Sequence, residues 1–282
     1  MSAPLRLGVI GHVEHITLGR ISAVPGPGDI VHLVAPSVLA GGGGGIAFFQ
    51  LARSAADLHL FTALGDDDGA QFVECAITTM TRATLHAARR SEPQTRDVVM
   101  VDPGGERTII VIGEPLHPRT DDPLPWDLFA ELDAIYFTAQ DPALLRLARR
   151  ARILVVPARR REAIAAAGIA IDVIVGSCND PREVSARADY AIPPAALVMT
   201  DGPRGGIVET ADGITRFTSP SVPSTGGSYG AGDSFAGALT YYLAAGLDPA
   251  QAAARAAHHG AAVIASLDPL AAQLPLPYEP AA

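Results

Sequence analysis

Short apolar runs alternate with helical stretches through the middle of the chain, and few folds accommodate such a rhythm. The apolar runs cover residues 134–137, 153–156 and 172–175, and stretches of helical composition lie between them at 143–150 and 160–167. Continuous apolar runs of this length are typical of parallel strands that are buried on both faces. The alternation therefore predicts an α/β fold, in which a mostly parallel sheet is covered by helices on both faces.

Further segments extend this predicted body toward both ends of the chain. They comprise strands at 5–10, 58–63, 196–200 and 206–209, a helix at 66–80 that opens with acidic residues, and two alanine-rich helices between 231 and 266. Nothing in the composition marks a linker between independent domains. We therefore expect one domain over residues 1–282.

Two segments differ from the βαβ rhythm. Residues 30–34 (IVHLV) alternate like a half-buried strand, and residues 95–112 contain two strand-like runs around the turn DPGG. A turn of this composition between two apolar runs indicates a hairpin. We expect residues 13–34 and 95–112 to form a small β appendage on the main body.

The charge composition limits the chemistry that is open to this chain. Its 282 residues include 30 acidic and 21 basic residues, and all of the basic residues are arginine. A chain without lysine has neither the phosphate-binding lysine of a P-loop nor a Schiff-base lysine. A net charge of −9 also argues against binding to a nucleic-acid backbone.

The two cysteines and the lengths of the apolar runs narrow the class of protein further. Cys75 and Cys178 suggest neither a disulfide framework nor a zinc site, since no cluster of cysteine and histidine accompanies them. No run approaches the roughly 20 apolar residues of a membrane span. The amino-terminal segment lacks the apolar core and cleavage site of a signal peptide. We expect a soluble, cytoplasmic protein without a membrane or nucleic-acid partner.

A glycine-rich turn into a helix is the clearest chemical motif. Gly230, Ala231 and Gly232 let the backbone turn closely, and Asp233 follows at the start of the predicted helix. Free N–H groups at a helix start, together with the helix dipole, favour an anion such as a phosphate. On its own, the aspartate has a plain alternative role as a stabilising first-turn acid.

Taken with the rest of the pattern, the chain resembles the ribokinase-like, or PfkB-type, carbohydrate kinases. The carboxy-terminal signature is residues 230–238 (GAGDSFAGA), and a degraded amino-terminal signature lies at 41–55, followed by 63–67 (ALGDD). The resemblance covers nearly the whole chain. It implies a doubly wound α/β domain with a small β-sheet lid, and ATP-dependent phosphorylation of a hydroxyl group.

The resemblance also implies roles at the glycine-rich turn. Asp233 would be the general base that takes the proton of the attacking hydroxyl, and the backbone of Gly230, Ala231 and Gly232 would hold the charge on the transferred phosphoryl group. This mechanism needs no Walker lysine. It implies ATP as the phosphoryl donor and Mg2+ as its companion ion.

Nucleotide and metal contacts follow from the same resemblance. Thr200, Gly202 and Gly205 match a turn that lies along ATP, although a plain strand-to-strand turn has the same composition. His258 falls where the family often has a residue beside adenine, with an ordinary helix-face histidine as the alternative. For magnesium, Asp180 would act through a water molecule. Asn179 with Glu183, or a helix N-cap at Asp180, are the other interpretations.

The predicted substrate pocket departs from ribokinases. Glu14 takes the place of an aspartate that binds sugar hydroxyls, and Gly42 still allows a close approach of the ligand. Gly43 and Ile46, however, stand where ribokinases usually have lysine and asparagine. The resemblance therefore implies a sugar or sugar-like substrate other than ribose, with a nucleoside as an alternative.

Three further expectations concern the lid and the activity as a whole. Arg107, in the 95–112 hairpin, would face the substrate if the hairpin is a lid, and would be solvated if it is a plain edge. Lids of this family often pair between subunits, which makes a homodimer an expectation. The altered motifs leave open a degenerate family member that binds a nucleotide or sugar without catalysis; the intact residues 230–233 oppose that alternative.

Overall fold

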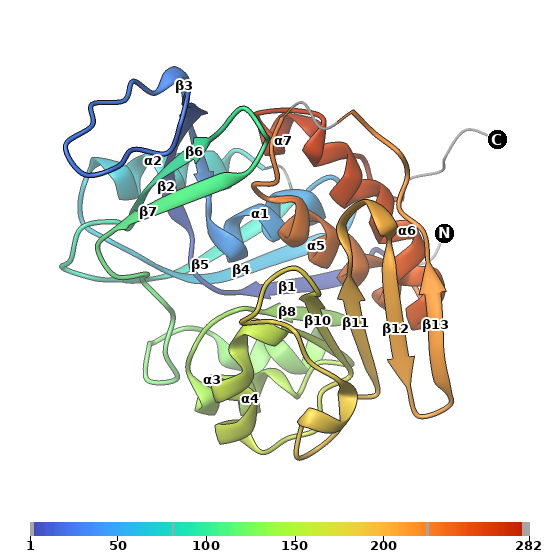
Figure 1. Cartoon of the computed structure of the whole chain (residues 1–282). Helices are drawn as coiled ribbons and strands as arrows, with labels where there is room; N and C mark the ends of the chain where they lie inside the picture. The colour runs from blue at the N-terminus through green and yellow to red at the C-terminus, as the bar shows by residue number, and fades with distance from the viewer. Residues whose placement is uncertain (1–2, 81, 224–225, 278–282) are drawn as a thin grey trace.

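The computed structural model describes residues 3–80, 82–223 and 226–277, and its largest element is a nine-stranded sheet (Figure 1). The strand order is β13-β12-β11-β10-β9-β8-β1-β4-β5. All pairs from β11 to β5 are parallel, and β12 and β13 add two antiparallel strands at one edge. The strands are β1 (Arg6–Ile10), β4 (Asp57–Leu64), β5 (Ala83–Arg89), β8 (Ala134–Phe137), β9 (Ile153–Pro157), β10 (Val173–Ser177), β11 (Ala196–Thr200), β12 (Gly206–Thr210) and β13 (Gly213–Phe217).

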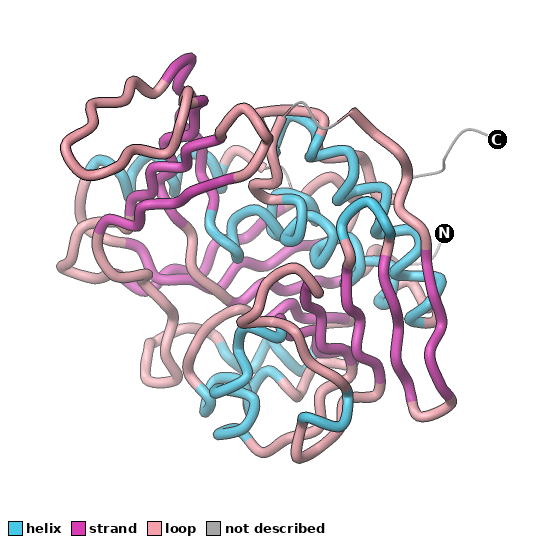
Figure 2. The backbone as a smooth tube through the Cα atoms, viewed as in Figure 1, coloured by secondary structure: helices cyan, strands magenta, loops and turns pink. Residues whose placement is uncertain are grey.

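Helices cover both faces of this sheet, which confirms the predicted fold class (Figures 1 and 2). In β8, Ala134 and Tyr136 face one apolar cluster, whereas Ile135 and Phe137 face the other. The first cluster also contains side chains of α1 (Gly42–Leu51), α2 (Asp68–Thr78), α5 (Ala231–Ala244) and α6 (Pro249–Ile264). The second contains side chains of α3 (Pro142–Ala148) and α4 (Arg161–Ala167), and the short helix α7 (Pro269–Ala272) packs near α1 and α6.

A second sheet of four strands lies to one side of the large body. Its order is β3-β2-β6-β7, formed by β2 (Glu14–Arg20), β3 (Val34–Gly41), β6 (Arg96–Val101) and β7 (Arg107–Ile112). β6 and β7 pair in antiparallel fashion, as the predicted hairpin requires. One face packs inward through Ile16, Leu18, Leu39, Val99 and Val101.

The prediction of a strand at residues 30–34 is wrong. Residues 29–33 belong to no strand, and the partner of β2 is β3, which starts at Val34 and runs to the glycine segment. Ile30 is 89% exposed, so its side chain does not pack against a sheet. The pairing of Glu14 with Gly41 instead fixes the register, and it brings the end of β3 directly to the start of β2.

The described helices also bear on the membrane question. None of the helices in residues 3–80, 82–223 and 226–277 combines the length and apolar character needed to span a bilayer.

Candidate active site

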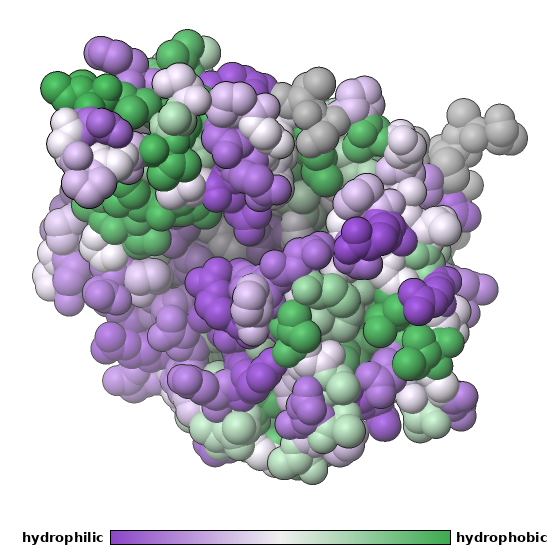
Figure 3. All heavy atoms as spheres, in the orientation of Figure 1, coloured by the Kyte–Doolittle hydropathy of each residue, from purple (hydrophilic) through white to green (hydrophobic). Residues whose placement is uncertain are grey.

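The carboxyl ends of the parallel strands carry the predicted functional segments. His12 follows β1, Thr138 follows β8, Arg159 and Arg160 follow β9, and Asp180 follows β10 shortly after its end. Ligands of open α/β sheets bind at this edge. In Figure 3 the surface is hollowed between the small sheet and the large body, and hydrophilic side chains border the hollow.

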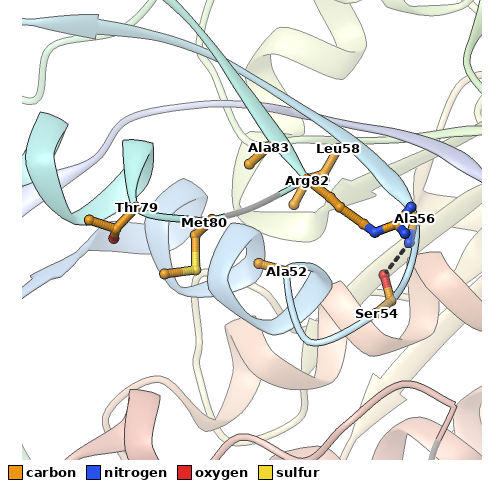
Figure 4. Close-up of a pocket in the computed structure, with 8 residues that line it drawn as sticks. All are labelled: Ala52, Ser54, Ala56, Leu58, Thr79, Met80, Arg82 and Ala83. Carbon is orange, nitrogen blue, oxygen red and sulfur yellow. Dashed lines mark hydrogen bonds between the residues drawn. The ribbon is translucent and has the colours of Figure 1, made fainter.

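A cavity elsewhere in the molecule is not part of this edge. It has a volume of about 230 Å³ and lies at the amino ends of β4 and β5 (Figure 4). Its lining residues are Ala52, Ser54, Ala56, Leu58, Thr79, Met80, Arg82 and Ala83. Because this is the opposite edge of the sheet, the cavity has no access to the glycine-rich turn before α5.

Helix α5 begins at that glycine-rich turn. Gly230 has φ of +78°, a left-handed conformation that glycine adopts without strain. A Cβ atom on Gly232 would contact nothing within 4 Å, so this stretch of backbone is open to a ligand. Within the described residues no side chain caps the helix. The first-turn N–H groups are thus placed to receive an anion.

Asp233 lies in the first turn of α5 and is half-buried. Burial raises the pKa of its carboxyl group to about 6; nearby Arg159 opposes the rise and Glu183 adds to it. A carboxyl group with a pKa near neutrality can accept a proton from a hydroxyl group efficiently. A Cβ atom built on Gly43 would lie 3.3 Å from Asp233 Oδ1, so the carboxyl group faces the glycine segment.

The glycine segment, residues 41–45, joins β3 to α1. The Gly42 N–H donates a hydrogen bond to the Tyr229 hydroxyl at 3.3 Å, and the Gly43 N–H donates one to His12 Nε2 at 3.3 Å. A Cβ atom on Gly42 would lie 2.9 Å from Glu14 Oε2. The segment therefore passes between Glu14 on one side and Asp233 on the other.

Glu14 forms a pair with Asp97 on the inner face of the small sheet. Both carboxyl groups are buried and hydrogen bond to each other. Burial, followed by Asp97, raises the pKa of Glu14 well above its ordinary range, and burial also raises the pKa of Asp97. Two carboxyl groups in contact share a proton, because both cannot easily ionise at once. The Asp97 Oδ1 atom has no hydrogen-bond partner among the described residues, so the pair can still accept from a ligand.

The structure places Ile46 away from these polar groups. Ile46 is fully buried in the apolar cluster of the small sheet, together with Tyr229. A Cβ atom on Gly230 would lie 3.3 Å from Ile46 Cγ2. Ile46 thus supports the turn before α5 from behind, and its role in substrate binding stays a prediction.

The predicted nucleotide segment follows β11. Thr200 ends that strand and its hydroxyl donates to the Gly176 carbonyl at 3.2 Å, which ties it to β10. Gly202 and Gly205 bound a single 3-10 turn (Gly202–Arg204). A Cβ atom on Gly205 would collide with the backbone of Phe217, so the glycine there also has a structural cause. The contacts of this turn with ATP stay predictions.

His258 lies on α6, two residues before Gly260. A Cβ atom on Gly260 would lie 3.1 Å from the Ala231 carbonyl oxygen, so this part of α6 packs against the start of α5. Burial and, after it, Arg255 lower the pKa of His258. The position agrees with a site near the glycine-rich turn, and the adenine contact stays a prediction.

Hydrogen bonds from arginines occupy the carboxylate of Asp180, which is predicted to hold a magnesium ion through a water molecule. Arg159 Nη2 donates to Asp180 Oδ2 at 2.7 Å, and the Arg182 backbone and side chain donate three more hydrogen bonds to the two oxygens. These contacts use the roughly four lone-pair positions of a carboxylate. They hold the pKa of Asp180 at about 2, with Arg182 as the main cause.

The alternative metal ligand is engaged as well. Arg159 Nε donates to Glu183 Oε1 at 2.9 Å, so one guanidinium joins both acids. Within the described residues no group of three or more histidine, cysteine or acidic side chains could hold a metal ion. Here arginine supplies the positive charge beside these carboxylates.

Arg107 lies on the inner side of the small sheet. It pairs with Val101 in the β6–β7 hairpin, and its Nη1 donates to Ser228 Oγ at 2.9 Å. Burial raises the pKa of Asp233, and the charge of Arg107 opposes this rise, to a smaller extent than Arg159 does. The expectation that Arg107 faces the site if the hairpin acts as a lid agrees with this placement.

Several residues of the site carry no local sequence signal. Asp97 sits in an ordinary strand, and Tyr229 precedes the glycine-rich turn without a motif of its own. Arg159 and Arg160 read as part of a basic helix start, and His117 lies in a loop. Each is brought to the site by tertiary contacts between distant segments, so only the three-dimensional arrangement identifies it.

Comparison with known proteins supports the resemblance to pfkB-type carbohydrate kinases. Residues 142–274 match the profile of the pfkB family carbohydrate kinases. This match covers 133 of the 282 residues. The matched segment contains the glycine-rich turn, Asp233, the predicted nucleotide segment and the arginines that follow β9. The resemblance that the motifs indicated is thereby confirmed.

Solved structures extend the structural likeness to nearly the whole length of the chain. Ribokinase from Thermotoga maritima is 18% identical with a TM-score of 0.78, and the match covers 96% of each chain. Ribokinase from Arabidopsis thaliana, solved with ribose and ATP, is 15% identical with a TM-score of 0.74, and again 96% of each chain is covered.

Adenosine kinase from Sinorhizobium meliloti is similar in the same way. It is 14% identical with a TM-score of 0.77, and the match covers 95% of this chain and 96% of that one. A search of curated proteins found no match to the sequence. The TM-scores establish the ribokinase-like fold. Sequence identities this low do not identify the substrate, which has to be inferred from the residues of the site.

Proposed function

We propose that this protein is a kinase that transfers a phosphoryl group from ATP to a hydroxyl group of a sugar or sugar-like molecule. The observation that carries the proposal is the position of Asp233. Its carboxyl group has a pKa of about 6, lies in the first turn of a helix that no described side chain caps, and faces the glycine segment beside Glu14. A base, an anion site and hydroxyl acceptors thus meet in one place.

In the proposed reaction Asp233 accepts the proton of the attacking hydroxyl group. The hydroxyl oxygen forms a new bond to the γ-phosphorus, the bond from that phosphorus to the bridging oxygen breaks, and ADP leaves with the electron pair. The N–H groups of Gly230, Ala231 and Gly232 stabilise the charge on the transferred group. Arg107 adds positive charge from the small sheet.

The Glu14–Asp97 pair is proposed to hold the acceptor substrate. Its oxygens accept hydrogen bonds from substrate hydroxyl groups, and Gly42 and Gly43 let the substrate come close to the protein backbone. Gly43, where ribokinases usually carry lysine, leaves space beside Asp233. A sugar other than free ribose remains the favoured acceptor, with a nucleoside as the alternative.

Nucleotide binding is proposed along the edge that carries Thr200, Gly202 and Gly205. These residues follow β11, while Asp233 and the glycine segment lie nearer β8 and β1 in the order of the sheet. ATP would thus lie from the β11 end toward the middle of the sheet. His258 would border its base.

The small sheet is proposed to pair with that of a second copy. Ile110 and Ile112 are 50% and 53% exposed on β7, which is an edge strand, and Val38 is also exposed on the same face. Figure 3 shows apolar surface gathered over this sheet and its neighbouring loop. Exposed apolar edge strands favour association. Replacing Ile110 by aspartate should convert a dimer to a monomer in size-exclusion chromatography; a monomeric wild-type protein would refute the pairing.

The experiment for the proposed activity is ATP consumption across a panel of sugars, sugar acids, sugar phosphates and nucleosides. We expect at least one to release ADP in proportion to phosphorylated product, and Asp233→Asn to abolish the release. If the purified protein binds ATP but no panel member is phosphorylated, the non-catalytic alternative is correct instead.

A further inference from the structure

Two neighbouring arginines at the end of β9 reach in opposite directions along the sheet edge. Arg159 pairs with Asp180 and Glu183, which follow β10 on the side of the predicted nucleotide segment. Arg160 Nε instead donates to the Thr138 carbonyl at 2.7 Å, on the side of β8 and β1. The two side chains therefore serve different halves of the site.

Arg160 is half-buried and lacks a counter-ion among the described residues. Its only hydrogen bond there is the one to Thr138, and no carboxylate lies within 4.0 Å of its guanidinium. Glu14 and Asp233 are close enough to act on its charge, yet burial still lowers the pKa of Arg160 overall. A buried cation without a paired anion is costly, and such a cost is offset where a ligand supplies the anion.

Two histidines near Arg160 have ring nitrogens without a hydrogen-bond partner among the described residues. His12 and His117 are in edge-on contact, with ring centroids 4.8 Å apart. His12 Nε2 accepts from Gly43, so the proton of the neutral ring is on Nδ1, and Nδ1 has no acceptor. Neither ring nitrogen of His117 has a partner among the described residues. Burial, with a smaller effect of Arg160, lowers the pKa of His117 to about 3, so this ring is neutral.

The His12 ring joins the two sides of the acceptor site, because its Nε2 atom lies 3.5 Å from Glu14 Oε1 and its Nδ1 atom has no partner among the described residues. The Glu14–Asp97 pair accepts from hydroxyl groups on the side of the small sheet, and it shares a proton, which limits its negative charge. Among the described residues, Arg160 donates only through Nε, to the Thr138 carbonyl, and His12 Nδ1 and both ring nitrogens of His117 have no partner. A neutral sugar would leave a guanidinium unpaired there.

We propose that the acceptor substrate carries an oxyanion, a carboxylate or a phosphate monoester, and that Arg160 binds it together with His12 and His117. This inference rests on the proposed kinase function and names the substrate class of that site: a polyhydroxy acid or a sugar phosphate. The hydroxyl groups face Glu14 and Asp233, and the oxyanion faces the end of β9.

The test compares matched pairs of acceptors that differ in the anionic group. The pairs are gluconate with glucose, fructose 6-phosphate with fructose, and ribose 5-phosphate with ribose. Binding to the full-length protein is measured by calorimetry without catalysis, and KM is measured by ADP release. We expect at least one anionic member to bind about 10- to 100-fold more tightly than its neutral partner. The carboxylate and phosphate arms tell the two sources of the oxyanion apart.

The variant Arg160→Gln should remove this preference and leave the KM for ATP within about twofold of wild type. Arg161→Gln is the matched control, because Arg161 is exposed and its Nη2 donates to the Val184 carbonyl at 2.8 Å. Thermal unfolding reports whether the Arg160→Gln variant is folded. If it is not, the inference is tested with the His117→Ala variant and with the binding of anionic and neutral acceptors to the wild-type protein.

Three results would overturn the inference. One is equal binding of anionic and neutral partners by the wild-type protein. Another is that Arg160→Gln weakens ATP and leaves the acceptor unchanged, which would assign Arg160 to the triphosphate. The third is an anionic preference that persists in a folded Arg160→Gln variant. Anionic binding without phosphorylation would instead refute the kinase function and leave the oxyanion site standing.

Discussion

The Tyr229 hydroxyl accepts a hydrogen bond from the Gly42 N–H at 3.3 Å, across 187 residues of sequence. Tyr229 directly precedes the turn that opens α5, and Gly42 lies at the start of α1 beside Glu14. One hydrogen bond therefore joins the proposed phosphoryl site to the proposed acceptor site. Together with the packing of α1 against α5, it sets the spacing of these two sites.

We predict that Tyr229→Phe raises the KM for the acceptor several-fold and leaves the KM for ATP near wild type. The change removes the acceptor of a buried N–H group, which costs about 1–3 kcal/mol of unfolding free energy. Steady-state kinetics and chemical denaturation measure both effects. Tyr241→Phe is the control, since Tyr241 is on α5 outside the site. Equal effects of the two variants would show that the Gly42 contact is irrelevant.

We predict that Asp233→Asn lowers kcat by about 10²- to 10⁴-fold, because an amide cannot accept the hydroxyl proton. Nucleotide affinity, measured by calorimetry, should change little. In the wild-type protein kcat should fall as the pH drops through about 6, where Asp233 becomes protonated. Retention of wild-type turnover in the variant would remove Asp233 from the mechanism.

The same carboxyl group should make the protein less stable at neutral pH. Its pKa is about 6 when folded and about 4 when unfolded, so the folded state binds more protons between these values and stability falls as pH rises. Above pH 6, Asp233→Asn should therefore have a larger free energy of unfolding than wild type, by at most about 3 kcal/mol, and a higher unfolding temperature. The difference should vanish near pH 4. Scanning calorimetry at pH 4 and pH 7.5 measures it, and a constant difference would contradict the linkage.

Two neighbouring glycines of α1 should respond oppositely to alanine. A Cβ atom on Gly44 would lie 2.6 Å from the His12 carbonyl oxygen and 3.1 Å from the Gly11 carbonyl carbon, so Gly44→Ala should destabilise the protein and disturb His12. On Gly45 the nearest contact would be 3.6 Å, to Val13. Gly45→Ala should gain up to about 1 kcal/mol from helix propensity. Urea unfolding of both variants checks the contrast, which equal midpoints would refute.

Ile46→Asn should destabilise the protein more than Ile46→Val does. The side chain is fully buried in an apolar cluster, and an amide there would lack partners. Ile46→Val loses one methylene group and should cost about 0.5–1.5 kcal/mol. Denaturation midpoints compare the two. If Ile46→Asn is as stable as wild type and improves ribose turnover, the pocket extends to this residue.

Elements with local patterns could be predicted from the sequence. The βαβ rhythm predicted the parallel sheet, because strands buried on both faces must be apolar throughout. The sequence of residues 230–233 predicted the turn and the helix start there, because glycine and a first-turn acid act within a few residues of one another. The same local approach was misled at residues 30–34, where alternating apolar residues cover no core.

The amino-acid sequence by itself determined the α/β class, the glycine-rich turn and Asp233, because each depends on neighbours in the chain. The tertiary structure alone decided that Asp97 pairs with Glu14, and that Arg159 neutralises Asp180 while Arg160 has no counter-ion in the described part of the chain. Electrostatic and hydrogen-bond partners come together through packing of strands that are distant in sequence. A charge is therefore paired or unpaired only once the sheet edge has brought its neighbours together.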